Sequence, residues 1–84
     1  MYEIKWTKKA QKQLKRLEKR HQEKLIAMAD SLRENPHQGN TMKMKGFDNR
    51  HRIKEGQFRV IYSIYKQQLL VEVLKAGFRE GIYK

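Results

Sequence analysis

The spacing of apolar residues predicts a strand and then two helices in the first half of the chain. Residues 2–6, YEIKW, alternate apolar and charged side chains with the period of a strand that buries one face. Apolar residues then recur at helical spacing over 7–20 and again over 22–34. Asn35-Pro36 ends the second helix, because the residue before a proline avoids the helical region. The short connection between the two helices predicts an antiparallel helical hairpin.

The second half of the chain predicts a loop followed by three strands. Residues 36–49 are rich in glycine, asparagine and other loop formers. Strands are then predicted over 50–54, where Ile53 is the apolar residue between Arg52 and Lys54, over 57–65, which alternates, and over 69–75, which is almost continuously apolar, as a central strand should be. The whole order predicts an α+β fold in which the helical hairpin packs on a mainly antiparallel four-stranded sheet, with a short turn or helix at the C-terminus.

The segment RIKEGQFR predicts a tight hairpin with clustered charge. If Glu55 and Gly56 form a two-residue loop, Arg52 lies directly opposite Arg59. Cross-strand partners share a face, so Arg52, Lys54 and Arg59 would project from one side while the apolar residues face the core. Like charges placed directly opposite cost about 0.2–1 kcal/mol per pair. A phosphate cradle would explain this cluster, and an ordinary solvated basic surface is the alternative.

The overall charge favours a polyanionic partner. The 84 residues include 20 Lys and Arg against 9 Asp and Glu, giving a formal net charge of +11, and such a surplus attracts nucleic acid or an acidic protein segment. The absence of cysteine excludes disulfides, a thiol nucleophile and thiolate metal sites, and it fits a reducing compartment. The charged N-terminus lacks the apolar run of a signal peptide or membrane span, so we expect a soluble cytoplasmic protein. Without linker or repeat, residues 1–84 are expected to form one domain.

The C-terminal segment AGFREGIYK adds a second group of candidate residues. Arg79 and Tyr83 are four residues apart and would share a face in one helical turn. Arg79 is suited to bind phosphate and Tyr83 to stack on a base, beside the cations of the hairpin. Packing of Tyr83 on the sheet is an equally open interpretation.

The hairpin and the tail together resemble the RelE/ParE superfamily of bacterial toxins. The segments MKGF, RIKEGQFRVIYSI and LLVEVLKAGFREGIY are similar to its basic segment, its R-I-x-x-G-x-[YF]-R hairpin and its tail ending in tyrosine. The resemblance covers essentially the whole chain. It implies the toxin of a type II toxin–antitoxin pair, with an acidic or amphipathic antitoxin segment as its partner. The RelE-like branch further implies an endoribonuclease that cleaves mRNA in the ribosomal A site and so inhibits translation.

The same resemblance implies attack of a ribose 2′-OH on the adjacent phosphate, without a metal or other cofactor. That reaction needs a base, stabilisation of the charge on the phosphorane and an acid. Arginines suit charge stabilisation, and neighbouring cations make Lys54 a candidate proton carrier because they disfavour its charged form. Carried over by position, the expected catalytic residues are Lys54, Arg59, Arg79 and Tyr83, and the expected phosphate-binding residues are Arg52, Lys54, Arg59 and Arg79.

Phe78 departs from the superfamily pattern and leaves the acid and base unassigned, because many relatives have His or Lys there. Two alternatives therefore stay open: a ParE-like inhibitor of DNA gyrase, and a basic toxin homologue without catalysis. Among the histidines, His51 alternates onto the apolar face beside Ile53. His21 and His37 fall in a predicted connection and a loop, where exposure to solvent is expected.

Overall fold

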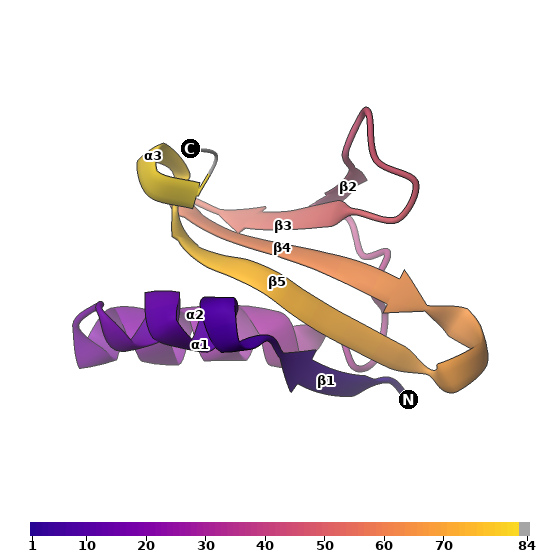
Figure 1. Cartoon of the computed structure of the whole chain (residues 1–84), viewed down its shortest axis with the longest axis horizontal. Coiled ribbons are helices and arrows are strands. Elements are labelled where there is room, and N and C mark those ends of the chain that lie inside the picture. The colour runs from indigo at the N-terminus through magenta and orange to yellow at the C-terminus, as the bar shows by residue number, and fades with distance from the viewer. Residues whose placement is uncertain (83–84) are drawn as a thin grey trace.

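The computed structural model describes residues 1–82 and is built on a single sheet (Figure 1). Its elements are, in chain order, β1 (Glu3–Trp6), α1 (Lys8–Lys15), α2 (Lys19–Ser31), β2 (Thr41–Lys43), β3 (His51–Glu55), β4 (Phe58–Tyr65), the short 3₁₀ turn η1 (Lys66–Gln68), β5 (Leu70–Phe78) and α3 (Arg79–Ile82). The strand order is β1-β5-β4-β3-β2, with β1 parallel to β5 and all other neighbours antiparallel. The predicted α+β fold is confirmed, but the sheet has five strands rather than the predicted four.

The two faces of the sheet are covered differently. Figure 1 shows α1 and α2 lying along one face. On the other face, α3 rises at one end and the loop between β2 and β3 rises at the other (Figure 1). Between these two segments, the second face is left to the side chains of the strands themselves.

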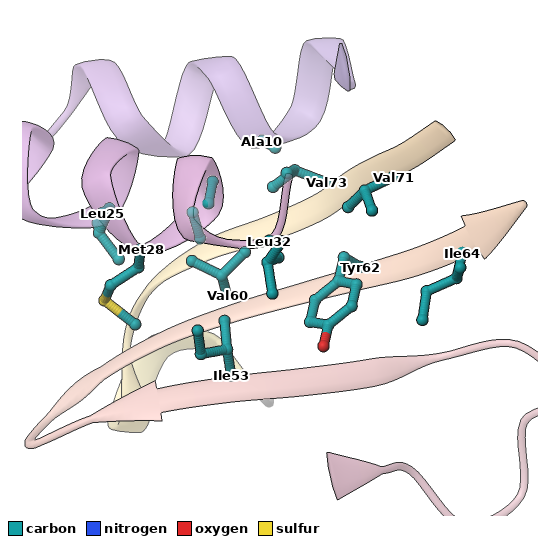
Figure 2. Close-up of a cluster of buried hydrophobic side chains, with 12 residues drawn as sticks. Ala10, Leu25, Met28, Leu32, Ile53, Val60, Tyr62, Ile64, Val71 and Val73 are labelled. Atoms are coloured by element: carbon teal, nitrogen blue, oxygen red, sulfur yellow. The ribbon is translucent and has the colours of Figure 1, made fainter. Parts of the chain in front are cut away.

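The core lies between α2 and the three central strands (Figure 2). Leu25 and Met28 of α2 and Leu32, its C-cap, are fully buried. The β4 residues Val60 and Tyr62, which they face across the layer, are also buried. The spacing of Leu25, Met28 and Leu32 is the period that predicted the helix. A chain of this size buries roughly 60–65% of the surface that its unfolded form exposes, which is close to the minimum for a stable domain. The fold therefore depends on this cluster.

Tyr62 carries the one polar group at the centre of this core. Its hydroxyl donates a hydrogen bond of 2.6 Å to the carbonyl of Pro36, just after α2. Burial raises the pKa of the Tyr62 hydroxyl to about 12. The hydrogen bond ties the end of the helical layer to the middle of the sheet, which satisfies a buried donor that would otherwise cost free energy.

The first helix is shorter than its apolar periodicity suggests, and the second, predicted over 22–34, begins and ends three residues earlier. Thr7 caps α1 as its hydroxyl accepts the Ala10 N–H at 3.1 Å, but α1 ends at Lys15 rather than near residue 20. Glu18 takes an extended conformation, and the side-chain amide of Gln22 donates to the Leu17 carbonyl at 2.8 Å. This side-chain hydrogen bond satisfies a backbone carbonyl at the break between α1 and α2. No glycine or proline marks the break in the sequence, so periodicity alone places the end of α1 too late.

Two features of the sheet were not predicted. The first is β2, a three-residue strand inside the segment expected to be a loop, which pairs with β3; it is too short for alternation to reveal it. The second is a bulge in β5, because Ile61 lies opposite Lys75 while Tyr62 lies opposite Val73. The extra residue, Leu74, reverses the alternation and so allows residues on both sides of the bulge to face the core.

Candidate nucleic-acid interface

The turn between β3 and β4 differs by one residue from the predicted turn. The loop is Gly56-Gln57, so Glu55 lies opposite Phe58, and the predicted Glu55-Gly56 loop is wrong. Gly56 has φ +60°, a conformation that costs glycine little and other residues more. Two-residue hairpins of the type II′ class take glycine at the first loop position, and this preference sets the pairing.

The new pairing leaves the predicted faces unchanged. Lys54, not Arg52, lies directly opposite Arg59, and Arg52 lies opposite Ile61. The strands are displaced by two residues relative to the prediction, and a two-residue shift preserves the alternation of side chains. Arg52, Lys54 and Arg59 therefore still share one face of the sheet, opposite to the Ile53–Val60 pair that is buried under α2. We call the side that carries these three residues the cation face.

Arg59 is almost completely buried on this face, with 7% of its surface exposed. Its Nη1 donates to the carbonyl of Gly56 at 2.6 Å and to that of Phe58 at 2.9 Å. Its Nε is buried and has no partner among residues 1–82, and the same is true of the Nε of Arg52. The hairpin turn thus fixes the Arg59 guanidinium in place, and its Nε donor is left without a hydrogen bond inside residues 1–82.

No carboxylate of the described chain neutralises this group. The ion pairs within residues 1–82 join Arg20 to Glu18, Arg33 to Asp30 and Lys24 to Glu55. Glu55 was the only acid near the hairpin in sequence. Because it lies opposite Phe58, it points to the helix side, where it bonds Lys24 of α2. The like charges of Lys54 and Arg59 are therefore uncompensated, which is the electrostatic condition for binding a polyanion.

Two further cations lie on the cation face and were missed by the sequence analysis. Lys75 pairs with Ile61 and extends the row of Arg52 across β4 to β5. The bulge in β5 determines on which face of the sheet Lys75 lies, and nothing in the sequence indicates that bulge. Arg50 continues the alternation of Arg52 and Lys54, because the Met44 N–H donates to its carbonyl at 2.8 Å and prolongs the β2–β3 pairing. Alternation through residues 50–54 was the signal available for Arg50.

Arg79 begins α3 beside the hairpin turn. Its N–H donates to the Gln57 carbonyl at 2.8 Å, and its side chain is exposed. Ile82, buried at the other end of α3, anchors this short helix on the sheet. The structure thus brings the start of the tail to the hairpin, as predicted. Tyr83 lies outside the described residues.

Phe78 lies on the helix side of the sheet rather than on the cation face. It pairs with Phe58, and the two rings are 5.1 Å apart. His21 packs on Phe78 with ring centroids 5.0 Å apart, so it is a half-buried residue of α2 and not the solvent-exposed connection residue that we expected. This aromatic cluster stabilises the end of the hairpin.

The other two histidines also lie away from the cation face. His51 stacks on Tyr62 at 5.6 Å, on the core side as predicted, and His37 lies edge-on to it at 5.7 Å. Burial and the neighbouring His37, Lys43 and Lys66 lower the pKa of His51 below its ordinary value of 6.5. Within residues 1–82, therefore, the cation face has lysine and arginine but no imidazole for proton transfer.

The described residues lack the features of two other kinds of site. Residues 1–82 contain no group of three or more His, Cys, Asp or Glu side chains placed to hold a metal ion. No helix in that part of the chain is long and apolar enough to cross a membrane.

Comparison with known proteins places the chain in a toxin family. Residues 4–83 match the family model of the ParE toxin of the type II toxin–antitoxin system parDE. The chain belongs to this family, and hence to the RelE/ParE superfamily of toxins of type II toxin–antitoxin systems. No curated protein sequence matches it.

Solved structures of RelE toxins share the fold. The RelBE2 toxin–antitoxin complex from Mycobacterium tuberculosis contains a chain that is 20% identical, with a TM-score of 0.84 over 93% of this chain and 98% of that one. The archaeal RelE–RelB complex from Pyrococcus horikoshii matches with 27% identity and a TM-score of 0.76, over 95% and 97%. The isolated RelE toxin of E. coli matches with 21% identity and a TM-score of 0.78, over 93% and 84%.

Proposed function

We propose that this toxin is a ribosome-dependent endoribonuclease that cleaves mRNA in the cytoplasm and thereby inhibits translation. The observation that carries the proposal is the pair of Lys54 and Arg59, directly opposite one another beside Arg52, with no carboxylate partner in residues 1–82. A phosphate entering this pair removes a repulsion that the free protein has to bear.

The reaction we propose is attack of a ribose 2′-OH on the adjacent phosphate. The 2′-oxygen forms a bond to phosphorus, the bond from phosphorus to the 5′-oxygen breaks, and a proton moves from the nucleophile to the leaving group through the enzyme. The products are a 2′,3′-cyclic phosphate and a free 5′-hydroxyl. Negative charge grows on the phosphorane oxygens in the transition state, so fixed cations accelerate the step.

The described residues divide this work by their environment. Arg59, held by two carbonyls of the hairpin, is the preorganised group for the phosphorane oxygens. Arg52 and Arg79 bind the flanking phosphates, because a guanidinium stays charged and offers several donors. Lys54, exposed and opposite Arg59, carries the proton. Tyr83 is proposed to stack on a base of the bound strand, as the superfamily resemblance implies.

The protein partner we propose is a cognate antitoxin with an acidic segment. The structures from M. tuberculosis and P. horikoshii are complexes of a RelE toxin with its antitoxin. In this chain, the unneutralised charge of the cation face is complementary to an acidic segment, which would cover the residues proposed for cleavage.

A second candidate function is inhibition of DNA gyrase. The matching family model is that of the ParE toxin, whereas the similar solved structures are RelE toxins. The two candidates make different lesions: an endoribonuclease cuts messages within codons, and a gyrase inhibitor causes DNA breaks and the SOS response. The cation face favours the first, because its charges are arranged along a strand that single-stranded RNA can follow.

The test is primer-extension mapping of mRNA exposed to the purified protein with and without ribosomes. We expect cuts within codons only when ribosomes are present, and Lys54→Gln should lower the rate about 100-fold. The matched control is Lys12→Gln, which removes an exposed cation of α1. Intact messages together with DNA breaks in induced cells would contradict the proposal and support the gyrase alternative.

A further inference from the structure

A pocket opens on the cation face at the end remote from α3. It has a volume of about 290 Å³ and is lined by Met42, Lys43, Met44, Lys45 and Arg52. These residues belong to β2, to β3 and to the loop between them, which Figure 1 shows rising from the face opposite α1 and α2. Neither the family match nor the resemblance gives this pocket a role.

Met42 and Arg52 form the floor of the pocket. They are paired across β2 and β3, so both project from the cation face. The Nη2 of Arg52 lies 3.7 Å from the Sδ of Met42, and the buried Nε of Arg52 has no partner in residues 1–82. The Arg52 guanidinium is thus held against an apolar side chain at the edge of an open pocket.

The exposure of Met42 suggests a ligand with an apolar surface. The side chain is 60% exposed, although it lies beside three cations and no carboxylate lines the pocket. Methionine adapts its shape to flat or irregular partners. A ligand that complements both features has an apolar face and negative charge, which describes a nucleotide.

The position of the pocket along β3 relates it to the proposed cleavage site. Arg52 precedes Lys54 by two residues, which corresponds to about 6.6 Å along a strand. This is close to the step between successive phosphates of an extended nucleic-acid strand. A scissile phosphate at Lys54 and Arg59 therefore places the neighbouring nucleotide at Arg52, with its base beside Met42.

We propose that this pocket receives the base next to the scissile phosphate and sets which bases the toxin accepts there. Met42 and Met44 contact the base, and Arg52 binds its phosphate. The pocket is smaller than the ~300–1,000 Å³ of sites for drug-sized ligands, which suits a single base. This inference rests on the proposed endoribonuclease function, because it assigns a specificity pocket to that site.

The experiment profiles cleavage sites in a translation reaction with mRNAs randomised around one codon. Wild-type protein should show a base preference at one nucleotide beside the cut. Met42→Ala should weaken that preference about tenfold, which corresponds to the loss of roughly two buried methylene groups. Met42→Leu keeps an apolar wall and should retain the preference. Ile26→Ala removes an exposed apolar side chain of α2 and should change nothing.

The outcomes separate this inference from the function on which it rests. If wild-type protein cuts no message, the proposed function fails, and the pocket assignment with it. If Met42→Ala cuts with the wild-type profile, or Met42→Leu loses the preference equally, the pocket assignment alone is overturned. Weaker antitoxin binding by Met42→Ala with an unchanged profile also overturns it, because the pocket would then serve the protein partner. The urea midpoint of each variant shows whether it is folded.

Discussion

Arg59 is an unusual residue, because arginines are rarely buried without an acidic partner. Here the hairpin carbonyls hold the guanidinium and Lys54 faces it across the strands. Like charges opposite one another repel, and the phosphate proposed to bind there would remove this repulsion. At the scale of single residues, the proposed site is therefore recognisable by a buried arginine that has hydrogen bonds to the turn but no carboxylate partner within residues 1–82.

Replacing Lys54 should improve stability and reduce activity in the same variant. Lys54→Gln removes the like charge opposite Arg59 while keeping the length of the side chain. We expect the free energy of unfolding to rise by about 0.2–1 kcal/mol, measured by urea denaturation, while mRNA cleavage falls. Lys12→Gln should change stability by less than about 0.5 kcal/mol. A less stable Lys54→Gln protein would contradict this account of the repulsion.

His51 predicts how stability depends on pH. Folding lowers its pKa below 6.5, chiefly through burial and then through His37, Lys43 and Lys66; Asp48 lines the same pocket. The unfolded chain therefore binds the His51 proton more readily than the folded chain does. The contribution of neutral His51 to stability is full above pH 6.5 and is lost as the pH falls below that value. In His51→Gln, the urea midpoint should fall less between about pH 7.5 and pH 5 than in wild type. Parallel curves for the two proteins would exclude this role.

At the scale of the elements, the sequence predicted which face of the sheet a residue occupies better than it predicted which residues pair across neighbouring strands. Alternation around Lys54 and Arg59 correctly placed these residues on one side of the sheet, although the turn was predicted at the wrong position. The placement held because the pairing of β3 with β4 is displaced by two residues, which preserves the faces. The pairing depended on which loop position Gly56 takes, and periodicity does not encode this. The side of Lys75 depended on the bulge at Leu74, which appears only when β4 and β5 are aligned. The role of Tyr83 remains a prediction.

The turn glycine provides a test at this scale. Gly56 has φ +60°, so Gly56→Ala should destabilise the protein by about 1 kcal/mol. Because the turn carbonyls also hold Arg59, cleavage should fall further than the loss of folded protein explains. Gly39→Ala is the matched control: Gly39 lacks a positive φ and has open space around its Cα, so its stability should not fall. Equal losses of stability in both variants would mean that the positive φ of Gly56 is not what makes alanine unfavourable in the turn.

At the scale of the whole molecule, the charge of +11 is distributed over both layers, and only part of it belongs to the proposed site. The basic side chains of α1 lie in the helical layer, whereas Arg52, Lys54, Arg59 and Arg79 belong to the sheet and its tail (Figure 1). Both groups attract nucleic acid at a distance, but the second includes Arg59, whose guanidinium is held by the turn carbonyls.

Salt dependence distinguishes these two groups of cations. Binding of single-stranded RNA should weaken with salt, with a slope of about −0.7 in log K against log[salt] for each phosphate contacted. If four cations of the sheet and tail each contact one phosphate, the slope is about −3, and Lys54→Gln reduces its magnitude by about 0.7. Lys12→Gln should leave the slope unchanged. The reverse result would assign RNA binding to α1.

The parallel pairing of β1 with β5 joins the first strand of the chain to the last. While a nascent chain is still being synthesised, β1 has no partner, and α1 and α2 have no completed sheet to cover. Because β5 pairs with both β1 and β4, the sheet cannot close before β5 has left the exit tunnel. The sheet that carries the cation face is thus completed only when strands from opposite ends of the described fold meet, so β1 waits unpaired for as long as β5 is missing.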